Sequence, residues 1–231
     1  MKKDLAQTTT MLRQRVNHLL ELQKGSPRNR VLIALAGVPG SGKSTISDAL
    51  IQDLMRHGIE EVAVLPMDGF HFSLATLSSF LDPDEALRRR GAPFTFDADG
   101  FVELVLRLRA MPVTMDESET TITAPSFDHA IKDPVPDAIA ISSRTKVVII
   151  EGNYTLLDRE PWSKISQAVD DKWFVNVAPD VVRERLALRH LRAGIESTRE
   201  AALFRAEEND IPNGEYVRSH SIRPDIYIQD L

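Results

Sequence analysis

The sequence has no cysteine among its 231 residues. A disulfide framework, a thiolate metal site and a thiol nucleophile are therefore all excluded. Any catalysis by this chain must use oxygen or nitrogen groups. The six histidines are not at the spacing of metal ligands, so the sequence gives no indication of a zinc site.

Long apolar segments are also missing. No run approaches the roughly 20 residues that a membrane-spanning helix needs, and polar residues soon after Met1 leave no apolar core of a signal peptide. The formal charge of −6 argues against nucleic acid as an obligatory partner, although a local basic pocket could still bind an anionic substrate. We therefore expect a cytoplasmic protein without membrane or nucleic-acid partners, and we leave a homodimer open.

What the sequence does contain is 42% hydrophobic residues, enough for one large α/β domain over residues 1–231. Short apolar runs at 31–36, 62–65, 147–150 and 173–177 are typical of strands buried on both faces. Helical patterns alternate with them, which favours a parallel sheet. We expect three additions: a helix within residues 1–26, an inserted hairpin-like region at about 112–144, and a lid at about 189–213.

Residues 37–44 complete the phosphate-loop pattern G-x-x-x-x-G-K-S, between an apolar run and a helical pattern. Such a loop points its N–H groups at a phosphate, and the helix N-terminus adds partial positive charge. Lys43 is placed to reach the β- and γ-phosphates, and the Ser44 hydroxyl to bind Mg²⁺. The alternative, a Gly/Ser loop that merely ends in Lys-Ser, is disfavoured by its flanks. The predicted nucleotide-binding residues are Gly37, Val38, Pro39, Gly40, Ser41, Gly42, Lys43, Ser44 and Thr45.

Two carboxylates directly follow strand candidates. Glu151 would face the phosphate loop if its strand neighbours that of the loop, and could then hold a Mg²⁺-bound water. Asp68 is the candidate general base, because phosphoryl transfer to an alcohol needs a carboxylate within reach of the hydroxyl proton. The alternatives are a solvated or helix-capping role for Glu151 and ordinary Asp-Gly turn chemistry for Asp68.

Three arginines, Arg185, Arg189 and Arg192, share one predicted helical face ahead of Gly194. Such a cluster can clamp transferring phosphates, and a hinged lid there would exclude water from the reaction. A solvated face paired with nearby glutamates is the competing interpretation. His71 and His129 could contact a hydroxylated substrate, although a single loop histidine is more often incidental.

Five segments together carry a family resemblance: residues 37–44, 67–71, 90–97, 125–129 and 151–154. The chain resembles the uridine kinase, phosphoribulokinase and pantothenate kinase group of P-loop kinases over about residues 31–225. More narrowly, it is similar to the nucleoside or nucleotide kinase-like branch, which includes fructose kinases and a fungal ATPase relative. The segment at 68–71 is nearer to the pantothenate and fructose-type relatives than to uridine kinases.

The resemblance implies a P-loop NTPase fold, a three-layer α/β/α arrangement with a parallel five-stranded sheet and a helical lid. It implies ATP with Mg²⁺ as phosphoryl donor, supports Asp68 as the base, and places Glu151 near the metal. Arg189 and Arg192 match the lid arginines by position. It suggests that Arg90, Phe127, Asp128 and His129 lie near the acceptor pocket. With them, the predicted substrate-binding residues are Asp68, His71, Glu151 and Tyr154.

The sequence therefore predicts an ATP-dependent kinase that phosphorylates a hydroxyl of a sugar, nucleoside or pantothenate-like acceptor. One alternative is a P-loop ATPase or nucleotide-dependent switch acting through a protein partner, with the amino-terminal helix as its contact. Another is nucleotide binding alone, which the presence of both Asp68 and Glu151 disfavours.

Overall fold

The computed structural model describes residues 5–26, 28–115 and 117–229. Within these ranges five parallel strands form one sheet in the order β2-β5-β1-β6-β7. Every residue of β1 is buried, as expected for a central strand covered on both faces. The strands of this sheet are β1 (Val31–Gly37), β2 (Val62–Pro66), β5 (Val147–Glu151), β6 (Asp171–Asn176) and β7 (Ile226–Gln229).

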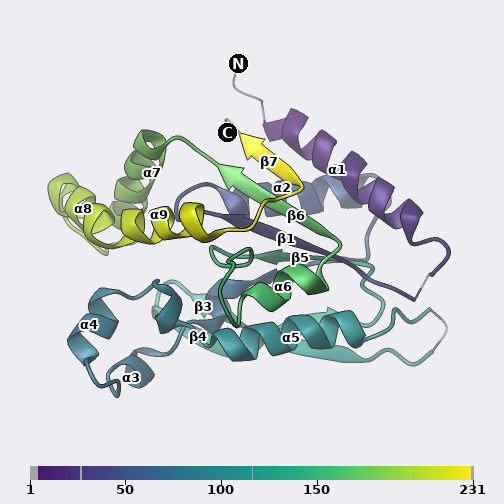
Figure 1. The fold of residues 1–231 in the computed structure, drawn as a ribbon, viewed down its shortest axis with the longest axis horizontal. Coiled ribbons are helices and arrows are strands. Elements are labelled where there is room, and N and C mark those ends of the chain that lie inside the picture. Colours follow the sequence, from purple (N-terminus) through teal and green to yellow (C-terminus); the bar gives the residue numbers. More distant parts are fainter. Residues whose placement is uncertain (1–4, 27, 116, 230–231) are drawn as a thin grey trace.

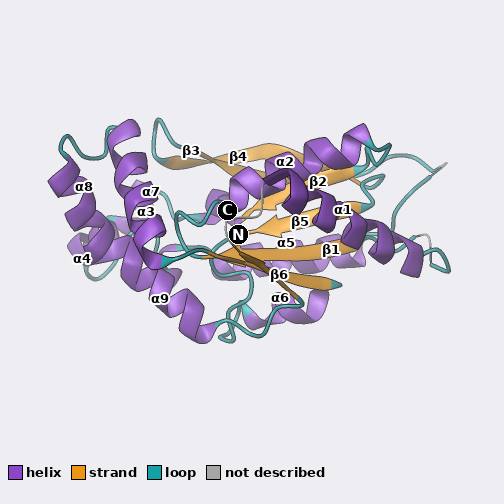
Figure 2. Ribbon diagram, turned by 90° about the horizontal axis from the view of Figure 1, so that it is seen from above, coloured by secondary structure: helices purple, strands orange, loops and turns teal. Residues whose placement is uncertain are grey.

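Helices cover both faces of the sheet (Figures 1 and 2). The helices α1 (Leu5–Leu22) and α2 (Lys43–Arg56) lie on one face, and α5 (Ala98–Ala110) and α6 (Ser163–Ala168) on the other. The predicted three-layer α/β/α arrangement with a parallel five-stranded sheet is confirmed. Among the helices of the described residues, none combines the length and hydropathy that crossing a bilayer would require.

Three further helices gather beyond one end of the sheet (Figure 1): α7 (Pro179–Arg192), α8 (Arg199–Arg205) and α9 (Ile211–His220). A single turn of π-helix at Ala206–Asp210 joins α8 to α9. Such turns often accompany functional sites, because the extra residue redirects the side chains around it. This helical group contains the segment 189–213.

The segment 112–144 contains an antiparallel hairpin of β3 (Thr121–Asp128) and β4 (Asp133–Ser142). The strands extend well beyond the short runs that sequence indicates, 121–123 and 138–141. The pairing is irregular between Ala124 and Ser126, around Pro125, which has no N–H to donate to a partner strand. Because proline usually ends a strand, the continuation to Asp128 was not apparent from the sequence.

Two short helices lie next to this hairpin: α3 (Leu74–Leu77) and α4 (Pro83–Arg88). The Asp82 carboxylate accepts a 3.0 Å hydrogen bond from the Glu85 amide and so caps α4, as the Asp-Pro pair predicts. Asp97 caps α5 in the same way through the Gly100 amide. The chain between them, Pro93–Thr95, forms one turn of 3₁₀ helix.

The amino-terminal helix is docked along the sheet rather than projecting from it. Leu12, Val16 and Leu19 are buried against the main core. Arg15 donates two hydrogen bonds of 2.8 and 2.7 Å to the buried carboxylate of Asp171 in β6. The packing role favoured for this helix from its apolar spacing therefore describes what it does here.

Candidate active site

A cavity of about 830 Å³ opens at the carboxyl ends of β1, β2 and β5, the edge at which open α/β sheets bind ligands. It brings together residues from segments far apart in the chain. The predicted site residues that line it are Pro39, Gly40, Gly42, Lys43, Ser44, Thr45, Asp68, His71, Glu151 and Arg189. Its other walls are formed by Leu5, Pro66, Gly91, Phe96, Gly152, Asn153, Arg185, Asp210 and Asn213.

The phosphate loop runs from the end of β1 into the first turn of α2. Gly42 occupies the position before that turn with a φ of +93°, a left-handed conformation that favours glycine. The amides of the first turn of α2 have no carbonyl partner within the helix, so they can bind an anion. Gly37, Val38 and Ser41 do not line the cavity themselves and belong to the buried part of the loop.

Lys43 is buried, and each of its hydrogen-bond partners is a neutral oxygen. Its Nζ lies 3.0 Å from the Gly37 carbonyl, 3.1 Å from the Val38 carbonyl and 2.7 Å from Asn153 Oδ1. Burial lowers the pKa of this ammonium to about 8, against the opposing charges of Glu151 and Asp68. Within the described ranges no carboxylate comes within ion-pair distance of it, so an anion entering the cavity would meet an unpaired cation.

Glu151 reaches the phosphate loop because β5 pairs directly with β1, with Leu35 opposite Glu151. Its two carboxylate oxygens accept hydrogen bonds from the hydroxyls of Ser44, at 2.7 Å, and Ser47, at 2.9 Å. A hydroxyl and a carboxylate held side by side beside a phosphate loop are the oxygen ligands that Mg²⁺ prefers. The donor set therefore fits the metal. Thr45 is exposed next to Ser44 and lines the cavity as well.

Asp68 follows β2 in a turn of 3₁₀ helix, Met67–Phe70, on the far side of β5 from the phosphate loop. Its carboxylate lines the cavity and is close enough to act on the charge of Lys43. The glycine after it is required by packing rather than by the turn alone. A Cβ at Gly69 would stand 2.0 Å from the Pro125 carbonyl, so β3 can approach only because no side chain is there.

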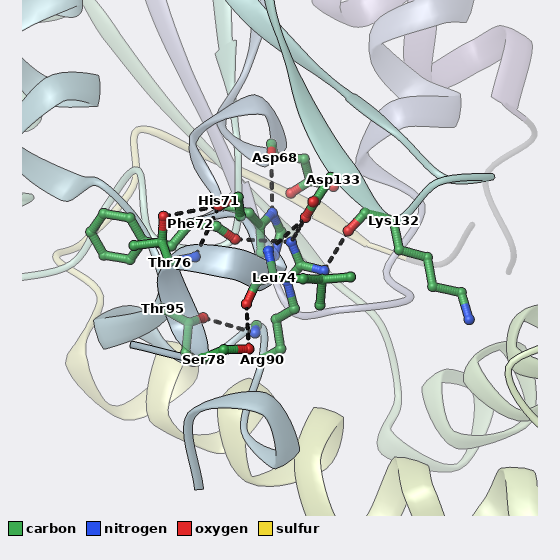
Figure 3. A network of polar contacts seen from close by, with 12 residues as sticks. Asp68, His71, Phe72, Leu74, Thr76, Ser78, Arg90, Thr95, Lys132 and Asp133 are labelled. Atoms are coloured by element: carbon green, nitrogen blue, oxygen red, sulfur yellow. Dashed lines mark hydrogen bonds and ion pairs between the residues drawn. The ribbon is translucent and has the colours of Figure 1, made fainter. Parts of the chain in front are cut away.

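His71 forms an aromatic wall of the cavity with Phe96. The two ring centroids are 3.9 Å apart, and the Phe127 ring packs 4.8 Å from His71 on its other side. His71 Nδ1 is 2.8 Å from the Asp68 carbonyl, a contact visible in Figure 3. Burial lowers the pKa of His71, with the nearby negative charge of Asp68 acting in the opposite direction. Its ring is therefore favoured in the neutral form.

Arg90 is placed in a structural network next to the cavity rather than in its lining (Figure 3). Its guanidinium donates 2.9 Å hydrogen bonds to the Phe72 carbonyl and to Asp133 Oδ1, and also contacts the Lys132 carbonyl. It stacks 5.4 Å above the Phe127 ring. These contacts tie the hairpin turn to the segment that follows Asp68, so Arg90 stabilises this side of the cavity.

The remaining residues assigned to the acceptor pocket do not line the cavity. Asp128 accepts a 2.7 Å hydrogen bond from the Ala130 amide in the hairpin turn, and His129 is exposed beside it. Tyr154 is fully buried and donates a 2.5 Å hydrogen bond to the Gly91 carbonyl, and burial raises its pKa. Phe127 contacts His71 from behind. None of these residues lines the cavity, and their role at an acceptor stays a prediction.

The helices beyond the sheet contribute cationic residues to the opposite wall. Arg189 lines the cavity, and its Nη2 lies 3.3 Å from Oδ1 of Asp210. The other oxygen of Asp210 is 3.2 Å from Nε2 of the buried His190. Arg185 also lines the cavity and donates to the Ser41 carbonyl at 3.4 Å. Arg192 is exposed at the end of α7, outside the lining.

Several cavity residues had no role in the sequence interpretation. Asn153 lies within 151–154, one of the segments that carry the family resemblance, but nothing in the sequence pattern connects it to Lys43. Asp210 ends the π-helical turn and Asn213 follows it, and the position of that turn has no signature in the sequence. Phe96 stood within a recognised segment without a role, and its spacing alone could not show that it packs on His71.

Comparison with known proteins gives a consistent result. Residues 32–192 match the model of the phosphoribulokinase and uridine kinase family. The chain is 43% identical over 216 residues to the Schizosaccharomyces pombe protein named "Putative uridine kinase C227.14", covering 93% of this chain and 88% of that protein.

Two solved structures share the architecture. One is described as a "putative fructose transport system kinase" from Silicibacter sp. TM1040, with a TM-score of 0.78 and 32% identity, covering 94% of this chain and 98% of that one. The other, YFH7 from Saccharomyces cerevisiae, is described as "a putative P-loop containing kinase with a circular permutation". It has a TM-score of 0.82 and 26% identity, and the superposition covers 96% of this chain and 98% of that one.

Proposed function

The chain belongs to the phosphoribulokinase and uridine kinase family, and we propose that it transfers the γ-phosphate of ATP to a hydroxyl group of a small sugar, nucleoside or pantothenate-like acceptor. The observation that carries this proposal is the buried, ion-unpaired Lys43 between the Ser44–Glu151 pair and Asp68. A site of this kind binds a polyphosphate at one point and presents a carboxylate to an alcohol at the next.

In this proposal each group has a separate task. Lys43 and the phosphate-loop amides hold the β- and γ-phosphates, and Arg189 neutralises charge on the group being transferred. Asp68 accepts the proton as the acceptor oxygen bonds to phosphorus and the bond to the β-phosphate oxygen breaks. Ser44 and Glu151 would hold Mg²⁺, which when bound neutralises charge between the β- and γ-phosphates.

The acceptor side of the cavity supports a hydroxylated compound with a ring. His71 and Phe96 provide aromatic surface, while Asp68 provides carboxylate oxygens that accept hydrogen bonds from hydroxyls. A nucleoside acceptor agrees with the name of the S. pombe relative, and a sugar acceptor agrees with the description of the Silicibacter structure. A cytoplasmic location and a homodimer stay predictions from the sequence.

The test is a phosphorylation screen read by mass spectrometry. The protein is incubated with ATP, Mg²⁺ and pooled sugars, nucleosides and pantothenate-like compounds, and each compound is examined for the added mass of one phosphoryl group. A Lys43→Ala variant under the same conditions gives the background. ATP consumption that depends on Lys43 without any phosphorylated acceptor would instead support the ATPase or switch that the sequence leaves as an alternative.

A further inference from the structure

The amino-terminal helix lies outside residues 32–192, the part of the chain that matches the family model, yet it reaches the cavity. Leu5, in its first turn, is half-buried and lines the same cavity as Thr45 of α2. Further along, Arg13 of α1 bonds to Asp53 of α2 at 2.8 Å. Because Arg13 bonds to Asp53 and the amino-terminal ends of both helices line one cavity, α1 and α2 run side by side in the same direction and begin at the same edge.

The first turn of α1 is held in this place by the rest of the helix. Leu12 and Val16 are fully buried against the core, and Arg15 binds the carboxylate of Asp171 in β6 through two hydrogen bonds. The bond from Arg15 to Asp171 places this part of α1 on the β6 side of β1. Asp68, by contrast, follows β2, on the other side of β1 and β5. The cavity thus has Asp68 at one end and Leu5 at the other, with the phosphate loop between them.

This order fixes the direction in which a nucleoside triphosphate could bind. The γ-phosphate must face Asp68 for an acceptor hydroxyl to attack it, and Lys43, close to Asp68 and Glu151, holds that end. The remainder of the nucleotide must then extend past Thr45 and away from Asp68. Helix α1 offers an apolar side chain to this part of the nucleotide, because Leu5 is the residue of the helix that lines the cavity within the described ranges.

We propose that the first turn of α1 forms the nucleobase subsite of the phosphoryl donor, with Leu5 packing on a face of the base. This inference rests on the proposed function, because it takes the donor to be a nucleotide. In this subsite Leu5 makes an apolar contact with the base, and a polyphosphate without a base cannot make that contact. The helix thereby has a second role beyond covering the sheet.

Isothermal calorimetry on the full chain tests the proposal with a neutral polar substitution, Leu5→Asn, that adds no charge near the phosphates. Losing one partly buried apolar contact should weaken Mg·ATP binding about five- to tenfold. Binding of Mg·tripolyphosphate, which has no base, should stay within about twofold. Leu22→Asn serves as the matched control, since Leu22 is at the far end of the same helix and 68% exposed. Unchanged ATP affinity, or equal weakening for both ligands, would overturn the proposal.

A second measurement uses the unsubstituted protein and so does not depend on whether the variant folds. Photolysis with 8-azido-ATP, followed by trypsin digestion, should label the peptide that contains Leu5, and excess ATP should suppress the label. Labelling confined to other peptides would count against the subsite. The two proposals fail differently: if the native protein binds no ATP, the proposed function fails, whereas normal ATP binding without involvement of α1 removes only this subsite.

Discussion

Asn153 Oδ1 lies 2.7 Å from Nζ of Lys43, which joins the segment after β5 to the phosphate loop. The ammonium also has the carbonyls of Gly37 and Val38 as partners, so its position is fixed before any ligand arrives. A lysine held in this way loses little side-chain freedom when it binds a phosphate, because that freedom is already lost on folding. The amide of Asn153 is thus a positioning group for the main phosphate-binding cation.

Two substitutions at Asn153 separate positioning from charge. Asn153→Ala removes one hydrogen bond and should weaken Mg·ATP binding about three- to tenfold. Asn153→Asp places an anion where Lys43 now has a neutral partner, and should weaken binding further because the carboxylate competes with phosphate for the cation. Calorimetric titration of the two variants checks the order. An aspartate variant that binds ATP as well as the native protein would refute this account of Lys43.

Asp68→Asn should lower kcat by about 10² to 10⁴ while leaving the Kd for Mg·ATP nearly unchanged. The amide keeps the shape of the side chain but accepts no proton, and the phosphate loop is untouched. Asp99→Asn, at an exposed position on α5, is the matched control. Steady-state kinetics with the acceptor found in the screen supply kcat. Native turnover in the asparagine variant would remove Asp68 from the role of base.

The sequence was informative about this site wherever strand ends determine position. The loop at 37–44, Asp68 and Glu151 each follow an apolar strand, although β2 before Asp68 is mostly half-buried, and parallel strands bring such ends to one edge. The sequence was uninformative where a contact depends on the direction in which a side chain points. Arg90 and Tyr154 stand in recognised segments, yet one joins a network behind the cavity and the other is fully buried.

The fold was predictable for a similar reason. In the main sheet of the described residues, β1, β2 and β5 are almost wholly apolar and β6 contains the apolar run 173–175, whereas β7 is a four-residue strand in which two isoleucines alternate with polar or exposed residues. Only its pairing with β6 makes it a strand, and that pairing is a tertiary event. The five-stranded sheet was implied by the family resemblance, but the residues of its last strand were not.

Glu151→Gln should raise the Mg²⁺ concentration needed for half-maximal activity by about tenfold. The amide retains hydrogen bonding to the hydroxyls of Ser44 and Ser47 but loses the negative charge that favours a divalent cation. Activity measured across a Mg²⁺ series at fixed ATP gives the shift. An unaltered Mg²⁺ dependence would mean that Glu151 only orients the two serines.

The lowered pKa of Lys43 predicts a pH dependence of binding. Because burial brings this pKa to about 8, the free protein loses the charge of Lys43 as the pH rises through 8. The Kd for ATP should therefore increase above pH 8, by up to about tenfold per pH unit, and binding near pH 8.5 should take up protons. Calorimetry in buffers of different ionisation enthalpy measures the uptake, and a Lys43→Met variant should show none.

The lowered pKa of Lys43 also affects folding stability, which should increase with pH where ATP binding weakens. Between pH 8 and the ordinary lysine value of 10.5, the folded protein binds fewer protons than the unfolded chain, so the free energy of unfolding should rise with pH over that window. The expected gain from Lys43 alone is on the order of 3 kcal/mol. Urea unfolding of the native protein and of the Lys43→Met variant, both without nucleotide, measures this contribution as the difference between their free energies of unfolding across the pH window. An equal pH dependence in both proteins would show that Lys43 is not the source.

Arg189 and Arg192 lie within one turn of each other on α7, and the structure gives them different surroundings. Arg189 lines the cavity, contacts Asp210 and contributes to lowering the pKa of Lys43, so its charge acts at the phosphate loop. Arg192 is exposed beyond the lining. Arg189→Ala should therefore reduce kcat about a hundredfold or more, as expected when a cation that neutralises transition-state charge is lost. Arg192→Ala, measured in the same kinetic assay, should stay within about threefold of native, and equal losses would show that the helices beyond the sheet rearrange enough on binding to bring both arginines to the phosphates.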